Sequence, residues 1–243
     1  MALLEVKEVS VRFGGLAALS EVSIAVPAGA ITGLIGPNGA GKTTLFNTIT
    51  GLQPPTSGRV LFEGSDIGPL QPHRRARLGM ARTFQRLELF TSLTVTENIE
   101  CALSMSARYR TRSESNHSAT TRLIQRTGLT SVAHELAGAL PTGTGRVVEL
   151  ARAIATDPKM ILLDEPASGQ DDAETRHFAE LLQELANDGM GVLLVEHDMD
   201  LVMSICDELY VLDFGRVLAS GTADSVRANP AVLDAYLGAG FNE

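Results

Sequence analysis

The sequence predicts an α/β fold built on a parallel sheet. In the last third of the 243-residue chain, short apolar runs typical of buried strands alternate with segments of helical periodicity. Earlier in the chain, a glycine-rich turn lies between an apolar run and a helical segment. Such alternation is typical of parallel strands joined by helical crossovers, and in sheets of this kind ligands bind at the carboxyl ends of the strands.

The N-terminal region predicts an antiparallel β layer. Residues 4–13 and 22–26 alternate apolar and polar side chains with the period of two that strands require. Residues 59–62 form a further short strand of the same layer.

A phosphate-binding loop is predicted at residues 36–44, which read Gly-Pro-Asn-Gly-Ala-Gly-Lys-Thr-Thr between a strand at 30–35 and a helix at 42–50. The spacing G-x-x-x-x-G-K-T lets backbone N–H groups surround a β-phosphate, and the helix N-terminus faces the same anion. Lys42 would reach the β- and γ-phosphates from a solvated site, and the Thr43 hydroxyl would bind Mg²⁺. The predicted ATP-binding residues of the loop are Gly36, Pro37, Asn38, Gly39, Ala40, Gly41, Lys42, Thr43 and Thr44.

Two helices are predicted in the middle of the chain. Thr94 and Glu97 make a capping box ahead of a helix over residues 98–107, and a second helix covers residues 118–127. The charged and polar stretch 108–116 between them is predicted to be an exposed loop.

The last third of the chain adds two buried strands, at residues 159–163 and 191–195. Each follows a helix whose apolar side chains recur every three or four residues, first within 147–154 and then within 178–185. This succession predicts parallel strands with helical crossovers.

The predicted fold class is therefore α/β, a P-loop NTPase core with an N-terminal antiparallel β layer and an inserted α-helical subdomain. Residues 1–87 and 141–243 form the core, and residues 88–140 form the helical subdomain. The whole chain, 1–243, is expected to be a single domain, which is long enough to bury a substantial core.

Two carboxylates form the second half of the predicted site. Asp164 and Glu165 follow the strand at 159–163 and should lie at its carboxyl end, beside the phosphate loop. Asp164 would hold Mg²⁺, and Glu165 would face the γ-phosphate and polarise the attacking water. The alternative is a solvated acidic pair that opens a helix, but the phosphate loop upstream favours the catalytic interpretation.

With these two motifs the chain resembles the ATP-binding-cassette (ABC) ATPases along essentially its whole length. Thr83-Phe84-Gln85 is similar to the family's Q-loop, Ser168-Gly169-Gln170-Asp171 to its D-loop, and Glu196-His197-Asp198 to its switch histidine. The resemblance implies that Gln85 contacts Mg²⁺ and the attacking water and relays the state of the site to a membrane partner. It also implies that His197 contacts the γ-phosphate, an assignment that rests on the order of the motifs.

Two further features are interpreted with this resemblance. Phe13 lies where the family places an aromatic ring against adenine, and the alternative is a phenylalanine packed in the core. Residues 71–77, with Arg82 and Arg86, form a basic cluster that we expect to be one solvated helix face. The alternative for this cluster is a role near a membrane partner or phospholipid.

The chain departs from the family in its signature motif. The family has Leu-Ser-Gly-Gly-Gln or a close variant, whereas residues 140–145 read Leu-Pro-Thr-Gly-Thr-Gly. Gly143 is retained and is expected to contact ATP held by a second ABC ATPase subunit, while Pro141 and Gly145 are assigned to the serine and glutamine positions. A homodimer would then have two weakened sites, so a heterodimer is predicted unless a neighbouring threonine supplies the missing hydroxyl.

The composition limits the function classes. A formal charge of −9, from 20 Lys+Arg and 29 Asp+Glu, argues against general binding to nucleic acid. No segment comes close to the run of about 18 uninterrupted apolar residues that a membrane span needs, and no signal peptide is evident. The chain by itself is therefore expected to be soluble, and any membrane role must come through a partner. The resemblance implies that permease subunits are this partner and hold the chain at the cytoplasmic face of the cell membrane. Cys101 and Cys206 lack metal-ligand spacing and are expected to be reduced.

Within the family, residues 12–19, 82–90, 197–221 and 229–238 are most similar to the ATPase subunits of branched-chain amino-acid importers. The resemblance implies an ATP-hydrolysing importer subunit for branched-chain amino acids or related small polar solutes. The alternatives are an ATPase subunit of another transport system (urea, amides or lipid export), a soluble ABC ATPase acting on DNA or ribosomes, and a regulatory subunit that hardly hydrolyses ATP.

Overall fold

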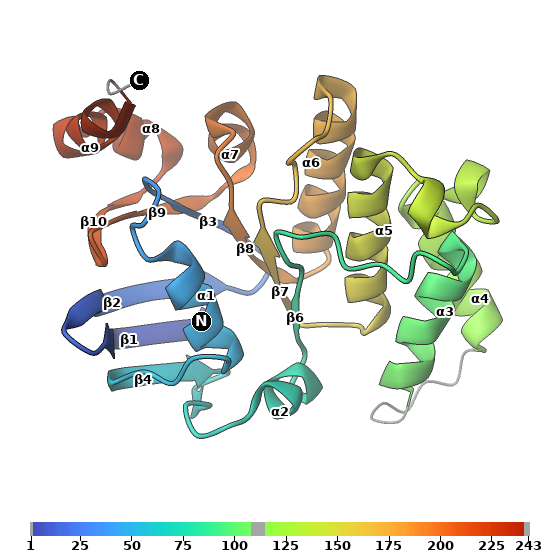
Figure 1. Cartoon of the computed structure of the whole chain (residues 1–243), viewed down its shortest axis with the longest axis horizontal. Coiled ribbons are helices and arrows are strands. Elements are labelled where there is room, and N and C mark those ends of the chain that lie inside the picture. The colour runs from blue at the N-terminus through green and yellow to red at the C-terminus, as the bar shows by residue number, and fades with distance from the viewer. Residues whose placement is uncertain (1, 108–114, 241–243) are drawn as a thin grey trace.

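The computed structural model describes residues 2–107 and 115–240, and it has the predicted α/β architecture with two sheets (Figure 1). The antiparallel sheet has the strand order β2 (Leu16–Pro27), β1 (Ala2–Phe13), β4 (Ser57–Phe62) and β5 (Ser65–Asp66). The second sheet has the order β10 (Arg216–Gly221), β9 (Glu208–Asp213), β3 (Ile31–Ile35), β8 (Gly191–Val195), β7 (Met160–Asp164) and β6 (Met80–Arg82). Its neighbouring strands run parallel except β9 and β10.

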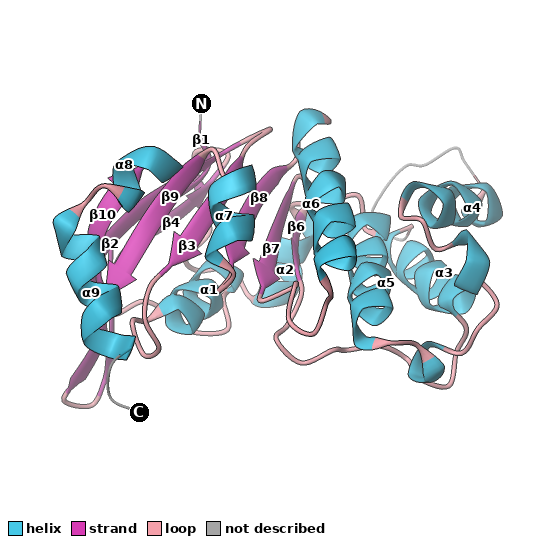
Figure 2. Ribbon diagram, turned by 90° about the horizontal axis from the view of Figure 1, so that it is seen from above, coloured by secondary structure: helices cyan, strands magenta, loops and turns pink. Residues whose placement is uncertain are grey.

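The helices are divided between the sheets and a mainly helical region at the right of Figure 1. Helix α1 (Lys42–Thr50) follows the phosphate loop, and Figure 2 shows α6 (Asp172–Asn187) and α7 (Met199–Ile205) against one face of the parallel sheet. The other helices are α2 (Pro72–Arg77), α3 (Val95–Ser106), α4 (Asn116–Arg126), α5 (Thr142–Ala155), α8 (Ala223–Arg227) and α9 (Pro230–Gly240). Short 3-10 turns lie at Thr130–Val132 and Ala137–Ala139.

Alternate side chains of the buried strands face two different cores. Met160 and Leu162 of β7 pack with α1 and the antiparallel sheet, so α1 is enclosed between the two sheets. Ile161 and Leu163 point the other way, into a cluster formed by α3, α4, α5 and α6. Because a strand buried on both faces needs apolar residues at every position, β7 reads as a continuous apolar run. Because β7 and β3 run parallel in the same sheet, the carboxyl end of β7 lies at the same edge as the phosphate loop that follows β3.

The predicted helices are present, with earlier starts. The capping box of Thr94 and Glu97 is formed, and α3 begins directly after Thr94. Ser115 caps α4, so this helix also starts before its predicted first residue. Part of the predicted exposed loop, 108–114, lies outside the described residues. Helices α3, α4 and α5 share one hydrophobic cluster across the proposed boundary at residue 140, and the division into core and subdomain stays a prediction.

The expectation that the basic cluster is one solvated helix face is wrong for Arg75. This side chain is only 2% exposed, and its guanidinium donates to the carbonyls of Thr48 (2.8 Å) and Ile49 (2.7 Å) at the end of α1. It also donates to the carbonyl of Gly68. The last carbonyls of a helix lack hydrogen-bond donors within the helix, and the Arg75 guanidinium provides donors for those of α1. Gly51, which ends α1 with φ 83°, leaves the space that the guanidinium occupies.

Among the residues that the structure describes, no helix combines the length and the apolar character needed to span a membrane. Cys101 and Cys206 are both unpaired. Burial raises the pKa of the Cys206 thiol to about 12, and the charge of Asp207 adds to the rise.

Iodoacetamide should therefore modify Cys206 slowly in the folded protein at pH 8. The thiolate is the reacting species, and raising the pKa from 9.0 to about 12 lowers its fraction about 10³-fold. Peptide mass spectrometry of timed samples, with urea-unfolded protein as the control, measures the difference. Equal rates of modification in the folded and unfolded protein would contradict the burial of this thiol.

Candidate functional site

The phosphate loop leaves the carboxyl end of β3 and is held tightly between two strands. Gly36 has φ 146°, and a Cβ there would lie 2.0 Å from the carbonyl oxygen of Leu212 in β9. Gly39 also has a positive φ, but nothing lies within 4 Å of the position where its Cβ would be. The loop is thus fixed at its start and open in its middle, as a cradle for an anion requires.

Lys42, the first residue of α1, points back into the loop. Its ammonium donates to the carbonyls of Gly36 (2.5 Å) and Pro37 (3.1 Å) and is buried. Burial lowers the pKa of Lys42, and the charges of Glu165 and Asp164 oppose that fall. The expectation of a solvated lysine is therefore wrong, because the loop encloses the ammonium at the point where phosphate oxygens would enter.

The loop opens into a cavity of about 530 Å³. One end of the cavity is polar and carries Gln85, Glu165 and His197, and the other end is formed by β2 and by the turn between β9 and β10. The lining residues are Leu16, Ala17, Ala18, Asn38, Gly39, Ala40, Gly41, Lys42, Thr43, Thr44, Gln85, Glu165, His197, Phe214 and Gly215.

The three side chains predicted to be catalytic meet in this cavity. Gln85 Nε2 donates to Glu165 Oε2 at 2.8 Å, and His197 Nε2 lies 2.6 Å from Glu165 Oε1. Glu165 has φ 51°, a left-handed conformation that non-glycine residues rarely adopt, and its N–H donates to the carbonyl of Val195 in β8. Two loops from separate parts of the chain, which carry Gln85 and His197, thus contact the carboxylate that a third loop carries.

Asp164, the last residue of β7, is buried beside them. Burial raises its pKa, and the guanidinium of Arg82 opposes that rise through its charge and a hydrogen bond to Oδ2 of 3.1 Å.

In the described residues, no cluster of three or more His, Cys, Asp or Glu side chains could hold a metal ion. The predicted Mg²⁺ ligands are instead one hydroxyl, one amide and one carboxylate, from Thr43, Gln85 and Asp164. Mg²⁺ commonly takes one or two protein carboxylates together with phosphate and water oxygens, so this donor set fits it.

Four predicted ATP-binding residues, Phe13, Gly36, Pro37 and Gly143, do not line the cavity, and neither does the predicted Mg²⁺ ligand Asp164. Phe13 pairs with Leu16 across the β1–β2 turn, and its ring is half exposed. Gly143 lies at the start of α5, where a Cβ would come within 2.3 Å of the carboxylate of Glu174. The predicted contact of Gly143 is with the ATP of a second subunit, and that contact stays a prediction.

The structure corrects the assignment of the signature glutamine to Gly145. A Cβ on Gly145 would lie 2.8 Å from Leu87 Cδ2, so this position faces packed side chains of the same chain. Counted from Leu140, the fifth position of the motif is Thr144, which is half-buried in the first turn of α5. Pro141 is the residue before that helix, makes no side-chain cap and has no hydroxyl, and its assignment to the serine position stays a prediction.

Arg82 was missed by the sequence interpretation, which placed it in the basic cluster. Its guanidinium donates to Asn47 Oδ1 of α1 (2.6 Å) as well as to Asp164, and it lies 4.9 Å from the centre of the Phe84 ring. It therefore joins the phosphate-loop helix, the acidic strand end and the segment carrying Gln85.

Glu196 and Arg146 were also missed, and both hold loops that carry the predicted catalytic residues. The buried carboxylate of Glu196 accepts from the N–H groups of Ala167 (2.7 Å) and His197 (3.0 Å), so it ties the loop after Glu165 to the switch histidine. Arg146 of α5 donates to the carbonyls of Phe84 and Gln85. Charged residues beside motifs are common in sequences, and only the fold shows which of them connect two loops.

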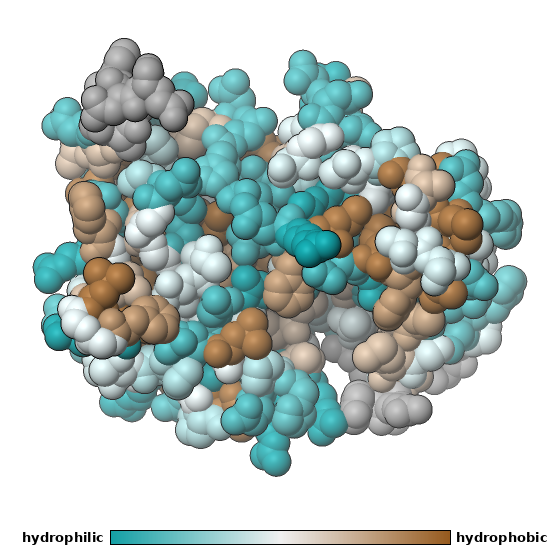
Figure 3. Space-filling view, in the orientation of Figure 1, coloured by the Kyte–Doolittle hydropathy of each residue, from teal (hydrophilic) through white to brown (hydrophobic). Residues whose placement is uncertain are grey.

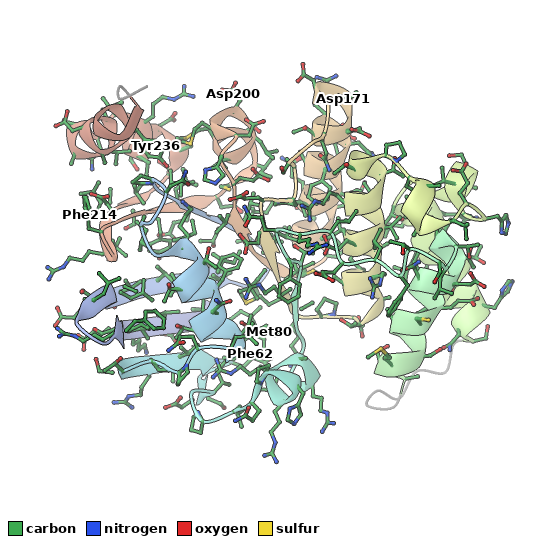
Figure 4. The ribbon with its side chains drawn as sticks, in the orientation of Figure 1. Phe62, Met80, Asp171, Asp200, Phe214 and Tyr236 are labelled. Carbon is green, nitrogen blue, oxygen red and sulfur yellow. The ribbon has the colours of Figure 1, made fainter. Side chains whose placement is uncertain are left out.

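The C-terminal helix also reaches the phosphate loop. Burial raises the pKa of Tyr236 in α9, and the N–H of Gly36, which donates to its hydroxyl, opposes the rise. Figure 4 labels Tyr236 beneath α9, on the side that faces the sheet.

The chain matches two family models. Residues 19–168 match the family described as ABC transporter, and residues 216–242 match the family described as branched-chain amino acid ATP-binding cassette transporter. Among curated relatives, the high-affinity branched-chain amino acid transport ATP-binding protein LivG of Escherichia coli K12 is 42% identical over 97% of this chain and 98% of its own length.

Solved structures with the same architecture are ATP-binding cassettes. A nucleotide-free cassette from an ABC transporter superposes with a TM-score of 0.87 at 32% identity, covering 97% of this chain and 99% of its own. A dimeric cassette in a post-hydrolysis state, bound to ADP and Pi, superposes with a TM-score of 0.79 at 26% identity and covers 90% of this chain and 98% of its own.

Proposed function

This chain belongs to the ABC transporter ATPase family, and from that premise we propose that it hydrolyses ATP to drive the import of branched-chain amino acids. The observation that carries the proposal is the meeting of Gln85 and His197 on the Glu165 carboxylate, beside the phosphate loop in one cavity. The likeness to LivG over nearly the whole chain supports the substrate class.

ATP binds with its phosphates in the loop. The backbone N–H groups at the start of α1 and the Lys42 ammonium face the β- and γ-phosphates, and both stabilise negative charge. We propose that Thr43, Asp164 and Gln85 hold Mg²⁺, which supplies charge neutralisation at the phosphate oxygens when bound. Arg82 holds Asp164 Oδ2, so it orients this carboxylate toward the loop.

Hydrolysis requires a water aligned with the γ-phosphorus and a group that takes its proton. Glu165 accepts that proton as the water oxygen bonds to phosphorus and the bond to the β-phosphate oxygen breaks, giving ADP and phosphate. His197 and Gln85 keep the carboxylate in place through contacts of 2.6 and 2.8 Å. Glu196 acts through His197 and is a positioning residue.

Lys42→Ala should weaken ATP binding by about 1.5–3 kcal/mol, the strength of a hydrogen bond to a charged group. Because Lys42 is buried against two loop carbonyls, its loss should also lower the melting temperature. Calorimetric titration with ATP and a parallel melting curve measure the two effects. Arg59→Ala, on the antiparallel sheet, serves as the control for loss of a cation. Unchanged ATP affinity in Lys42→Ala would overturn the site assignment.

We propose that membrane permease subunits dock on a groove beside Gln85. A hollow of about 290 Å³ lies between the end of α1, α2 and β6, and an adjoining hollow of about 350 Å³ lies between β6, α3 and α5; both include Phe84. Phe84, Phe90 and Met105 expose apolar surface there. Since Arg82 contacts both Phe84 and Asp164, a partner that moves this ring would act on the nucleotide site. Docking to permease subunits would hold the chain at the cytoplasmic face of the membrane.

We further propose that the working transporter pairs this chain with a second ABC ATPase subunit whose signature is intact. The dimeric cassette that superposes on this chain supports pairing. In this chain Pro141 replaces the signature serine, so the surface offered to a partner's ATP lacks that hydroxyl.

The double change Pro141→Ser with Thr144→Gln should raise the ATPase rate of the isolated chain by about 10- to 150-fold, which corresponds to about 1.5–3 kcal/mol for a hydrogen bond to charged phosphate. The rate is measured against protein concentration, with Pro141→Ala as the control. A steep second-order rise in the unmodified chain, with no gain from the double change, would refute the heterodimer.

The substrate class is tested by uptake in cells that lack the chain. Restoring the gene should restore uptake of labelled leucine, and excess valine and isoleucine should compete for that uptake. Restored uptake of urea or an amide, with none of leucine, would assign the chain to another import system.

A further inference from the structure

Exposed apolar side chains gather at the end of the nucleotide cavity that faces away from Glu165. Phe13, Leu16 and Phe214 are 50%, 69% and 88% exposed, and Leu16 and Phe214 line the cavity. Figure 3 shows apolar surface at the left edge of the molecule, over the turns at the ends of the antiparallel sheet and of β10. Phe214 is labelled in the same region of Figure 4, beside the strands β9 and β10.

We propose that the ring of Phe214, with Leu16, forms the wall that receives the adenine base of ATP. This inference rests on the proposed function, because it takes the phosphate loop as the site of the triphosphate. It assigns a base-contacting role to a residue of the β9–β10 turn, far in the sequence from Phe13.

The turn that carries Phe214 is fixed to the phosphate loop. The N–H of Gly215 donates to the carbonyl of Ala40 at 2.9 Å, and the N–H of Ser20 donates to the carbonyl of Gly215 at 2.7 Å. The turn is therefore bonded both to the loop and to β2. As a result, the backbone that carries the Phe214 ring is held next to the loop that would bind the phosphate groups.

The backbone of Phe214 is also in an uncommon conformation. Its φ of 42° lies in the left-handed region, which is unfavourable for a bulky side chain. The surrounding hydrogen bonds maintain this conformation, and the result is a phenylalanine held almost wholly in solvent. Burying that ring against a ligand would remove apolar surface from water.

The two ends of the cavity determine the direction of the bound nucleotide. The γ-phosphate must lie at the end with Glu165 and His197, where hydrolysis occurs, so the nucleoside must extend toward Leu16 and Phe214. A purine base is flat and has a π-face, and an aromatic ring with a neighbouring aliphatic side chain is the surface that suits it.

Calorimetric titrations with Mg-ATP and with Mg-tripolyphosphate, which has phosphates but no base, test the assignment. Phe214→Ala should weaken ATP binding about 5- to 150-fold, the range for stacking one base on an aromatic ring, and leave tripolyphosphate binding unchanged. Phe214→Tyr keeps the ring and should keep ATP affinity. Leu218→Ala, which removes an exposed apolar side chain from β10, is the control and should bind ATP normally.

The possible outcomes separate the alternatives. Equal weakening of both ligands by Phe214→Ala would mean that the residue shapes the loop, and unchanged ATP affinity would mean that the ring does not contact the base. Loss of assembly with a second subunit, with ATP binding intact, would make the ring a protein contact. Each of these results overturns the inference. Normal binding of both ligands by Lys42→Ala would instead contradict the proposed function.

Discussion

Glu165→Gln is expected to slow ATP hydrolysis by at least ~10²-fold, the scale for loss of a positioned general base. The amide has the same shape as the carboxylate, so it should still contact Gln85 and His197, which lie 2.8 and 2.6 Å from the carboxylate oxygens. It cannot take a proton from water. ATP affinity should therefore remain close to that of the unmodified chain, and only the chemical step should fail.

Single-turnover hydrolysis of labelled ATP, with enzyme in excess over nucleotide, isolates that step. Glu180→Gln, on the exposed side of α6, is the matched control and should hydrolyse ATP at the normal rate. Near-normal turnover by Glu165→Gln would remove Glu165 from the role of general base.

Arg82→Ala should lower the free energy of unfolding by about 3–5 kcal/mol, the range for removing one partner of a buried ion pair. The side chains of Arg82 and Asp164 are each 9% exposed, so water cannot replace the lost guanidinium. The change also removes the contact with Asn47 and the packing of the guanidinium against Phe84. Arg82→Lys keeps the charge but cannot bond both partners in the same way, and it should recover only part of the loss.

Urea unfolding at neutral pH measures this change, and Arg86→Ala supplies the control. Arg86 is exposed in the same segment, so its loss should change stability by no more than about 0.5 kcal/mol. Adding Asp164→Asn to Arg82→Ala removes the unpaired charge and should restore part of the stability. An Arg82→Ala protein as stable as the Arg86→Ala protein would contradict the buried pair.

The parts of the fold and of the site that the sequence predicted are those set by neighbouring residues. The glycines and the lysine of the phosphate loop lie within one turn, and the capping box at Thr94 involves a residue three positions away. In both cases the local spacing determines the geometry. The acidic pair was placed correctly at the carboxyl end of a buried strand, which ends at Asp164.

The parts that escaped prediction depend on contacts between distant segments. Arg82 and Asp164 are far apart in the chain, and Arg75 reaches the end of α1 from another helix. A run of arginines has the same sequence pattern whether it is solvated or buried, so charge alone misplaced Arg75. The role proposed for Phe214 likewise depends on a turn that the phosphate loop holds in place. The signature glutamine was misassigned by one position, because the fifth residue counted from Leu140 is Thr144, whereas Gly145 packs against Leu87.

We propose that ATP hydrolysis at Glu165 drives the import of branched-chain amino acids. The most direct test is to measure leucine uptake and ATP hydrolysis together in proteoliposomes that contain this chain with its permease and ATPase partners. The unmodified assembly should show both activities, and the assembly with Glu165→Gln in this chain should bind ATP but lose most of the hydrolysis and the uptake together. Uptake at the unmodified rate after hydrolysis at this site has been lost would show that hydrolysis at Glu165 does not drive import.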